Sequence, residues 1–258
     1  MKNQSPTPTP IVSMKQKLTT VAFVAALLLT GVGTSFGQTT NNIAVANYSF
    51  ETPVEPANSY GGPVGSGWTS TAIGGTCVFN CVHPGTTDGR FGVGNGSPVG
   101  MNSNQYCQIF AIAPAYGNIY LDIAHSFVNG ATYQLTAAFG KEGGTLAAGA
   151  QMVLENNSGA NYASTNILAA NLITDQFVDQ GLTWVASGAS GNVRLLFTIP
   201  ATVSANSFFD FDNIRLVEIL PPGVAITNQP VSQSALPGQA VSFSVGATVS
   251  SGTPLTYQ

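Results

Sequence analysis

Residues 132–139 read Thr-Tyr-Gln-Leu-Thr-Ala-Ala-Phe, and this stretch decides the fold class. Tyr133, Leu135 and Phe139 stand at alternate positions, with threonine and glutamine among the residues between them. A period of two places successive side chains on opposite faces of a strand, so one face of this segment is expected to point into a core. Residues 193–199 repeat the pattern with apolar side chains at every odd position.

The remainder of residues 41–218 consists of short runs rich in Val, Ile, Thr, Phe and Tyr, separated by clusters of Gly, Asn, Ser and Pro. No segment carries a convincing helical stripe, and residues 143–150 and 163–172 are expected to be loop or strand edge. Further strands are expected at residues 44–50, 105–112, 151–155, 182–186 and 208–217. The sequence therefore predicts an all-β chain whose first domain, residues 38–220, is a β-sandwich of two sheets.

The N-terminus carries the pattern of a signal peptide. A short basic segment at residues 14–17 precedes an apolar run without charge at residues 21–32, and small residues follow at Ser35 and Gly37. These are the proportions of a cleavable leader, whereas a membrane helix would need a longer run. We expect residues 1–37 to be a signal peptide with an N-terminal extension, which makes the protein secreted or attached to the cell surface.

The charge of the chain limits its partners. The sequence has 11 acidic and 7 basic residues, a formal net charge of −4, and three of the lysines precede the apolar run. Such a chain attracts no polyanion, so we expect no nucleic-acid partner. After the leader no apolar run approaches the length of a membrane span, so no span is expected in the mature chain.

Three cysteines, Cys77, Cys81 and Cys107, fall within the first domain. An exported protein can form disulfides, and the odd number leaves one thiol unpaired in the monomer. We expect one disulfide that involves Cys107. Two alternatives stay open: free buried thiols, and a zinc site with His83, although the spacing matches no common zinc pattern.

A second domain is expected after the first. The two prolines and the glycine that begin residues 221–225 are typical of a semi-rigid linker. Within residues 226–258, three segments resemble the first strands of a bacterial immunoglobulin-like domain: 226–233, 236–245 and 255–258. So short a segment cannot bury a core alone, so further domains of the same protein are expected beyond Gln258.

Five short motifs of the first domain occur in a familiar order. They are Asn47-Tyr-Ser-Phe-Glu51, Gly67-Trp68, Gln108, Tyr133-Gln-Leu-Thr136 and Phe211-Asp-Asn-Ile-Arg-Leu216. Together they resemble the galactose-binding-like jelly rolls of bacterial carbohydrate-binding modules. The resemblance implies a jelly-roll sandwich that binds a polysaccharide or another glycan, as a module of a larger surface or secreted protein. Two rivals are a structural or adhesive spacer without a glycan ligand, and an accessory domain of an enzyme whose catalytic part lies beyond the chain end.

The resemblance also implies a structural calcium ion, with Glu51 and Asp212 as the matching carboxylates. On a regular strand Asp212 would share a face with Ile214 and Leu216, so its carboxylate is expected to point toward the core. A buried carboxylate requires a cation, hydrogen bonds or a proton. Calcium is one solution, and backbone amides of the first strand are the other.

Sugar-binding modules place aromatic rings against the apolar face of a pyranose. Trp68 and Trp184 are the largest aromatic residues, but both are expected to pack in the interior. We therefore expect the ligand to be bound by tyrosines that lie nearer to polar loops: Tyr60, Tyr106, Tyr116 and Tyr120.

No catalytic residues are expected. Glycoside hydrolysis needs two carboxylates across a cleft, and the pair Asp210 and Asp212 is more simply explained as acids near a strand end. No nucleophile elbow of the form G-x-S-x-G accompanies His125, which is expected to be a hydrogen-bonded strand residue. The sequence thus predicts that the chain is not an enzyme.

Overall fold

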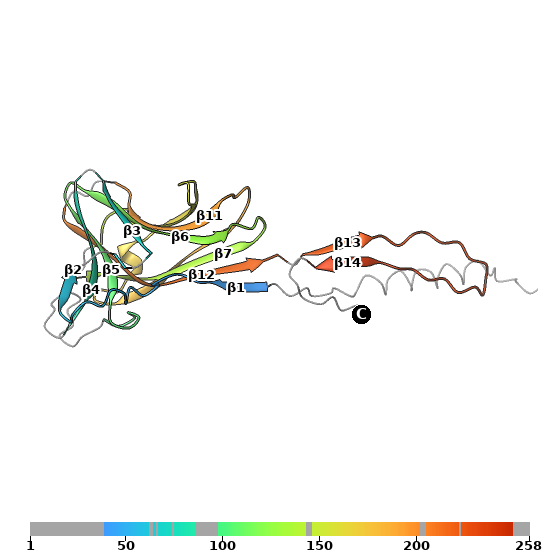
Figure 1. Cartoon of the computed structure of the whole chain (residues 1–258), viewed down its shortest axis with the longest axis horizontal. Helices are drawn as coiled ribbons and strands as arrows, with labels where there is room; N and C mark the ends of the chain where they lie inside the picture. Colours follow the sequence, from blue (N-terminus) through green and yellow to red (C-terminus); the bar gives the residue numbers. More distant parts are fainter. Residues whose placement is uncertain are drawn as a thin grey trace, which may run out of the picture. The chain divides into compact units, whose positions relative to one another are not determined.

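The computed structural model describes residues 39–61, 64–65, 67–73, 75–85, 98–142, 146–201, 205–221 and 223–249. These residues form an all-β chain, as predicted, with a seven-stranded and a five-stranded antiparallel sheet packed as a sandwich (Figure 1). The signal peptide predicted for residues 1–37 and the strand expected at residues 255–258 lie outside the described residues.

The larger sheet has the strand order β10-β7-β12-β5-β4-β2, and β1 also pairs with β12. Its strands are β1 (Thr39–Ile43), β2 (Ser59–Gly61), β4 (Thr76–His83), β5 (Tyr106–Ile112), β7 (Thr132–Gly140), β10 (Phe177–Val185) and β12 (Ser207–Leu220). Because β12 is the longest strand, its first part can pair with β5 and its last part with β1.

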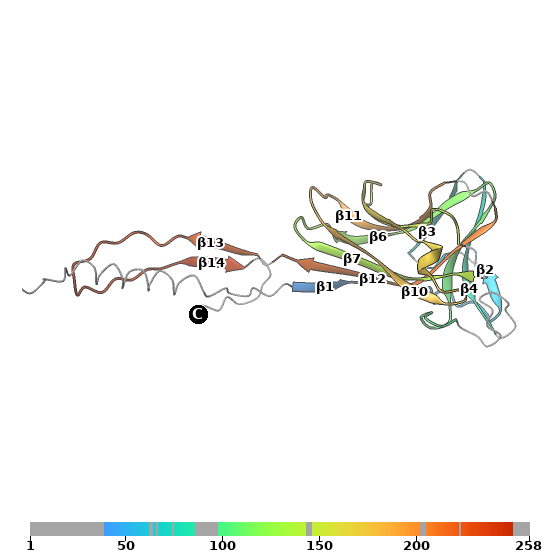
Figure 2. The same cartoon turned by 180° about the vertical axis from the view of Figure 1, so that it is seen from behind.

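The smaller sheet has the order β3-β6-β11-β8-β9 and forms the second layer; Figure 2, which turns the molecule by 180°, labels its strands β3, β6 and β11. Its strands are β3 (Thr69–Ile73), β6 (Tyr116–Ser126), β8 (Gln151–Asn156), β9 (Asn161–Asn166) and β11 (Asn192–Ile199). A 3-10 turn at Ala169–Asn171 follows β9. Among the described residues no helix is long and apolar enough to cross a membrane.

The strands expected at residues 105–112, 151–155, 182–186 and 208–217 are confirmed by β5, β8, β10 and β12, except that residues 105 and 186 lie just outside β5 and β10. The strand expected at residues 44–50 is wrong. Asn47 and Phe50 have positive φ angles of 46° and 55°, and the Phe50 N–H donates to the Asn47 carbonyl over 3.1 Å. The Asn47 side chain also accepts from the Thr52 N–H and donates to the Thr52 carbonyl. These local bonds compete with sheet pairing and turn the chain after β1.

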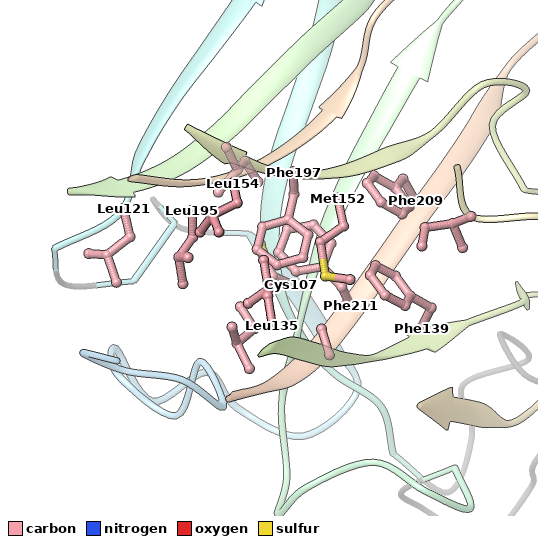
Figure 3. Close-up of a cluster of buried hydrophobic side chains, with 14 of the residues drawn as sticks. Cys107, Leu121, Leu135, Phe139, Met152, Leu154, Leu195, Phe197, Phe209 and Phe211 are labelled. Carbon is pink, nitrogen blue, oxygen red and sulfur yellow. The ribbon is translucent and has the colours of Figure 1, made fainter. Parts of the chain in front are cut away.

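The core lies between the two sheets and is rich in aromatic rings. Phe197 of β11 stacks on Phe211 of β12 with ring centroids 4.3 Å apart and planes 8° apart. Phe139 and Phe209 form a second stack, with centroids 5.5 Å apart. Figure 3 shows these rings beside Met152 and Leu195, so side chains of both sheets interdigitate in one apolar layer. The alternation noted in residues 132–139 and 193–199 does identify core-facing side chains.

A bulge divides β12 into two parts. The register to β7 shifts between Asp212 and Arg215, and Asn213 has a φ of 49°. The extra residue reverses which side chains face the core. Phe211 and Ile214 both belong to the core, and Asp212 lies between them on the opposite face. The expectation that Asp212 shares a face with Ile214 is therefore wrong, although its carboxylate is fully buried.

The part of the chain after the sandwich contains β13 (Val224–Asn228) and β14 (Gly246–Val249), which form a two-stranded antiparallel sheet. Residues 236–245 were expected to form a strand but have none, and β14 comes directly after them. Phe243 is 64% exposed and Leu236 77% exposed, so neither side chain is packed into a core. A two-stranded sheet is common to many folds, so the immunoglobulin-like assignment stays a prediction.

Candidate ligand site on the outer face of the larger sheet

The outer face of the larger sheet carries buried polar side chains. Asn80, Gln108 and Asp210 lie directly opposite one another on β4, β5 and β12. The residues on either side of Gln108 and Asp210 belong to the core, so these side chains point away from it. They are at most 5% exposed. Together with Glu142, which follows β7 and is 8% exposed, they are called the polar row below.

The carboxamide of Gln108 connects the polar row. Its Nε2 donates to Asp210 Oδ1 over 2.8 Å and to Glu142 Oε2 over 3.1 Å. Its Oε1 accepts from Asn80 Nδ2 over 3.5 Å. One carboxylate oxygen of Asp210 and one of Glu142 thus contact the same nitrogen, so these two oxygens lie within about 6 Å of each other. At this separation two carboxyl groups can act on one bound molecule.

An aromatic pair lies beside the polar row on the same face. Phe110 follows Gln108 by two positions on β5, and Phe208 precedes Asp210 by two on β12. The two rings are stacked, with centroids 4.7 Å apart and planes 14° apart. Both side chains are only half-buried, in contrast to the polar row. A half-exposed apolar surface thus lies next to amide and carboxylate groups that are almost completely buried.

Two of the predicted ligand-binding tyrosines lie on this face. Tyr60 of β2, Val82 of β4 and Tyr106 of β5 are opposite one another in the row next to the polar row. Tyr60 is 65% exposed, whereas Tyr106 is fully buried and packs against Phe177 with ring centroids 5.2 Å apart. Of this pair, only Tyr60 presents a ring to solvent.

The other two predicted tyrosines lie elsewhere. Tyr116 and Tyr120 belong to β6 of the smaller sheet. The Arg194 guanidinium lies 4.2 Å from the centroid of the Tyr120 ring and forms two hydrogen bonds with Asp122. The four tyrosines therefore do not form one binding surface, and their contact with a ligand stays a prediction.

Both tryptophans pack as expected. Trp68 is 7% exposed, contacts Phe50 and Phe197, and donates its Nε1–H to the Ala46 carbonyl over 3.0 Å. Trp184 is half-buried and stacks on Tyr162 of β9, with planes 3° apart.

The predicted calcium ligands both bind the segment before β5. Asp212 accepts from the N–H groups of Asn102 (2.5 Å) and Asn213 (2.7 Å). Glu51 Oε1 accepts from the N–H groups of Asn104 and Gln105. Burial raises the pKa of Asp212 to about 8, although the two N–H donors lower it, and the negative charge of Glu51 adds to the rise.

Glycine allows this segment to reach its place. The Phe177 N–H donates to the Val99 carbonyl over 2.8 Å, which ties residues 98–101 to β10. Gly100 has a φ of 84°, and a Cβ there would collide with the Phe177 carbonyl. The backbone approach that positions the Asn102 N–H therefore requires glycine at position 100.

Calcium fits the chemistry of these residues. Asp212 is a buried carboxylate whose charge is incompletely compensated, and calcium accepts carboxylate and carbonyl oxygens. Within the described residues no three His, Cys, Asp or Glu side chains form a metal-binding group, so Glu51 and Asp212 would need carbonyl or water ligands as well. The calcium site stays a prediction. Backbone N–H groups already donate hydrogen bonds to both carboxylates.

Calcium is expected to raise the melting temperature of the protein relative to EDTA. A hundredfold excess over Kd stabilises the folded state by about 2.7 kcal/mol, or about 5 to 10 °C for a domain of this size. Asp212→Asn should abolish this difference, whereas Asp122→Asn on the smaller sheet should retain it. Thermal melts in EDTA and in millimolar calcium measure the effect. Equal melting temperatures of the unsubstituted protein in EDTA and in calcium would contradict the predicted calcium site.

A second buried polar cluster lies at the inner face of β12. Glu218 is 2% exposed and accepts from Tyr133 Oη over 2.6 Å and from Asn41 Nδ2 over 3.0 Å. His125 Nε2 of β6 lies 3.0 Å from Glu218 Oε1, so His125 is a hydrogen-bonded strand residue as predicted. Burial alone would raise the pKa of Glu218, but the hydrogen bonds from Tyr133, His125 and Asn41 lower it overall.

Sequence reasoning missed most of the candidate site. Gln108 was noted only as part of a motif, and Asp210 was compared only with Asp212, its neighbour two positions away. Asn80, Glu142 and the Phe110–Phe208 pair were not singled out. One signal was present: β5 has apolar residues at both phases, which is typical of a strand that is covered on both faces.

Comparisons with known proteins give the fold and no family. No family model matches the chain, and no curated protein matches it. Among solved structures, the Stig cyclase Fisc from Fischerella sp. TAU has a TM-score of 0.56 at 16% identity, covering 70% of this chain and 98% of that chain. A cyclase from Fischerella sp. TAU in complex with 4-(1H-indol-3-yl)butan-2-one has a TM-score of 0.56 at 17% identity, covering 70% and 99%.

Carbohydrate-binding modules are also among the similar structures. The CBM22-1 xylan-binding domain from Paenibacillus barcinonensis Xyn10C has a TM-score of 0.42 at 15% identity, covering 72% of this chain and 99% of that chain. This likeness is too weak to carry an argument. The chain is therefore a β-sandwich of the fold that the Fischerella cyclases have, and identities this low establish the fold alone.

The cyclases correct one prediction. The inference that the chain is not an enzyme rests on its resemblance to binding modules and on the lack of a convincing pair of catalytic carboxylates in the sequence. That inference is overturned, because solved structures with the same sandwich include enzymes and this fold therefore does not exclude catalysis. The polar row also brings together two carboxylates, Asp210 and Glu142, that are 68 positions apart in the sequence.

Proposed function

We propose that the chain binds a small saccharide on the outer face of its larger sheet, with the polar row and the Phe110–Phe208 pair as contacts. The observation that carries this proposal is the combination of the two features. Amide and carboxylate groups can bond the hydroxyls of a sugar, and a stacked aromatic pair can cover the apolar face of its ring. Tyr60 stands exposed in the adjacent row and would extend the surface.

A second candidate is proton-transfer chemistry on an aromatic or unsaturated substrate. It is favoured by the two carboxylates that share Gln108 Nε2, since neighbouring carboxyl groups can serve as general acid and general base. The similar cyclase that holds an indole ketone has the same fold. In this candidate the Phe110–Phe208 pair would stack on an aromatic ring instead of on a sugar.

Calorimetric titration of the full chain tests both candidates. The probes are a panel of plant, algal and bacterial oligosaccharides, and 4-(1H-indol-3-yl)butan-2-one. The first candidate predicts binding of a saccharide with a Kd between micromolar and millimolar, because one or two stacked rings with a few hydrogen bonds supply little more. Binding of the indole ketone without any saccharide would favour the second candidate, and release of reducing sugar would identify a hydrolase.

Substitutions locate the binding surface. Asp210→Asn and Phe208→Ala are each expected to weaken binding about tenfold, since each removes about 1.4 kcal/mol of contact energy. Asp122→Asn on the smaller sheet is the matched control and should change the Kd less than twofold. Melting temperatures of the variants show whether they are folded. A structural or adhesive spacer without a ligand is the interpretation that remains if no probe binds.

A further inference from the structure

Two of the three cysteines face each other across neighbouring strands. Cys81 of β4 and Cys107 of β5 are directly opposite in the antiparallel register, and both are completely buried in the same core cluster. Residues opposite each other in an antiparallel pair have Cα atoms about 4.5 to 5.5 Å apart. Disulfides span Cα separations of about 4.4 to 6.8 Å, a range that includes the spacing of residues opposite each other in such a pair.

Cys77 is placed differently. It lies four positions before Cys81 on the same strand, opposite Ala111, and is half-buried. Its sulfur points toward the smaller sheet, where a Cβ placed on Gly117 of β6 would lie 3.1 Å from Cys77 Sγ. Cys107 therefore lies opposite a thiol, that of Cys81. Cys77 lies opposite Ala111, which has no thiol.

We propose that Cys81 and Cys107 form a redox pair that closes to a disulfide when the protein folds under oxidising conditions, with Cys77 left as a thiol. In the structure all three cysteines carry thiols. In the oxidation both S–H bonds break, one S–S bond forms, and two protons and two electrons leave. A disulfide oxidant such as oxidised glutathione takes up both electrons and both protons, its own S–S bond breaks, and it becomes two thiols.

Burial determines when this exchange can occur. Exchange requires a thiolate and access to the oxidant. Burial raises the pKa of Cys81 to about 11 and that of Cys107 well above its usual value. The bond is therefore expected to form before the core closes, and afterwards to resist both oxidants and reductants. It would connect β4 and β5 on the inner side of the sheet, directly behind Asn80 and Gln108 of the polar row.

The test starts from the full chain, unfolded and reduced in guanidinium chloride with dithiothreitol. The protein is refolded in a mixture of reduced and oxidised glutathione, quenched with an alkylating reagent under denaturing conditions, and analysed by mass spectrometry. We expect one alkylated thiol instead of three and a cross-linked peptide that joins the segments of Cys81 and Cys107. Protein that is kept folded and reduced before exposure to oxidised glutathione should acquire this bond at least tenfold more slowly.

Variants establish which thiols are paired. Cys77→Ser should form the same cross-link, whereas Cys81→Ser and Cys107→Ser should form none. The oxidised Cys77→Ser protein should melt about 5 to 10 °C above its reduced form, because a loop of this length restricts the unfolded chain. Three alkylated thiols after refolding would overturn the proposal, as would a cross-link that contains Cys77. The unsubstituted protein and Cys77→Ser decide the outcome even where the Cys81→Ser or Cys107→Ser protein does not fold.

Discussion

Phe211→Ala is expected to lower the free energy of unfolding by about 3 to 5 kcal/mol, the range for removal of a buried phenylalanine from a core. Phe211 is fully buried on β12 and stacks on Phe197 of the opposite sheet. It also meets Phe50 edge-on at 5.6 Å and Phe209 at 5.4 Å. Its removal leaves a cavity where both sheets meet, and the rigid neighbouring rings cannot collapse to fill it.

Urea denaturation followed by intrinsic fluorescence measures this loss. Phe243→Ala is the matched control, because the same side chain is 64% exposed there and should contribute less than about 0.5 kcal/mol. An unchanged m-value would show that the two proteins unfold from equally compact states. If Phe211→Ala were as stable as Phe243→Ala, the two sheets could not be packed around this ring.

Glu218→Gln is expected to lower the free energy of unfolding at pH 7 by about 1.5 to 3 kcal/mol, the range for hydrogen bonds to a charged group. The carboxylate accepts from Tyr133, His125 and Asn41, and these bonds lower its pKa in spite of burial. Because the folded pKa lies below the unfolded one, the unfolded state binds more protons where the two differ. This stabilisation is complete above the unfolded pKa of about 4.3 and is lost as the pH falls through the folded value.

Chemical denaturation between pH 2.5 and 7 measures this dependence. The unsubstituted protein should lose stability below about pH 4.5 more steeply than Glu218→Gln, whose side chain does not titrate. Asp122→Asn removes a half-exposed carboxylate of the smaller sheet and should leave most of the acid dependence intact. Parallel curves for the unsubstituted protein and Glu218→Gln would mean that Glu218 carries no linked proton.

Much of the fold could be predicted because strand alternation is local. Residues 132–139 and 193–199 alternate without interruption, and the structure makes them β7 and β11 with the expected faces inward. Residues 44–50 have a similar composition, but Asn47 bonds its own neighbours and turns the chain. Strand propensity does not reveal that hydrogen bonds from the Asn47 side chain compete with sheet pairing, because these bonds join residues five positions apart.

The candidate site could not be predicted in the same way. Asn80, Gln108 and Asp210 are brought together by pairing of β4, β5 and β12, and 102 positions separate Gln108 from Asp210. Spacing along the chain says nothing about which strands become neighbours. The tyrosines were chosen for nearby polar loops, and the structure distributes them over both sheets.

The sequence by itself determined the all-β class and the core-facing positions of regular strands, because a period of two depends only on neighbouring residues. Only the tertiary structure decided which face of β12 carries Asp212. The bulge at Asn213 adds one residue and shifts the alternation, so Asp212 keeps the face of Asp210 while Ile214 and Leu216 turn to the core. Asparagine tolerates a positive φ but does not require one, so residue 213 alone does not determine the bulge. β12 pairs with β7 on both sides of the bulge, and this pairing buries both Phe211 and Ile214 in the core.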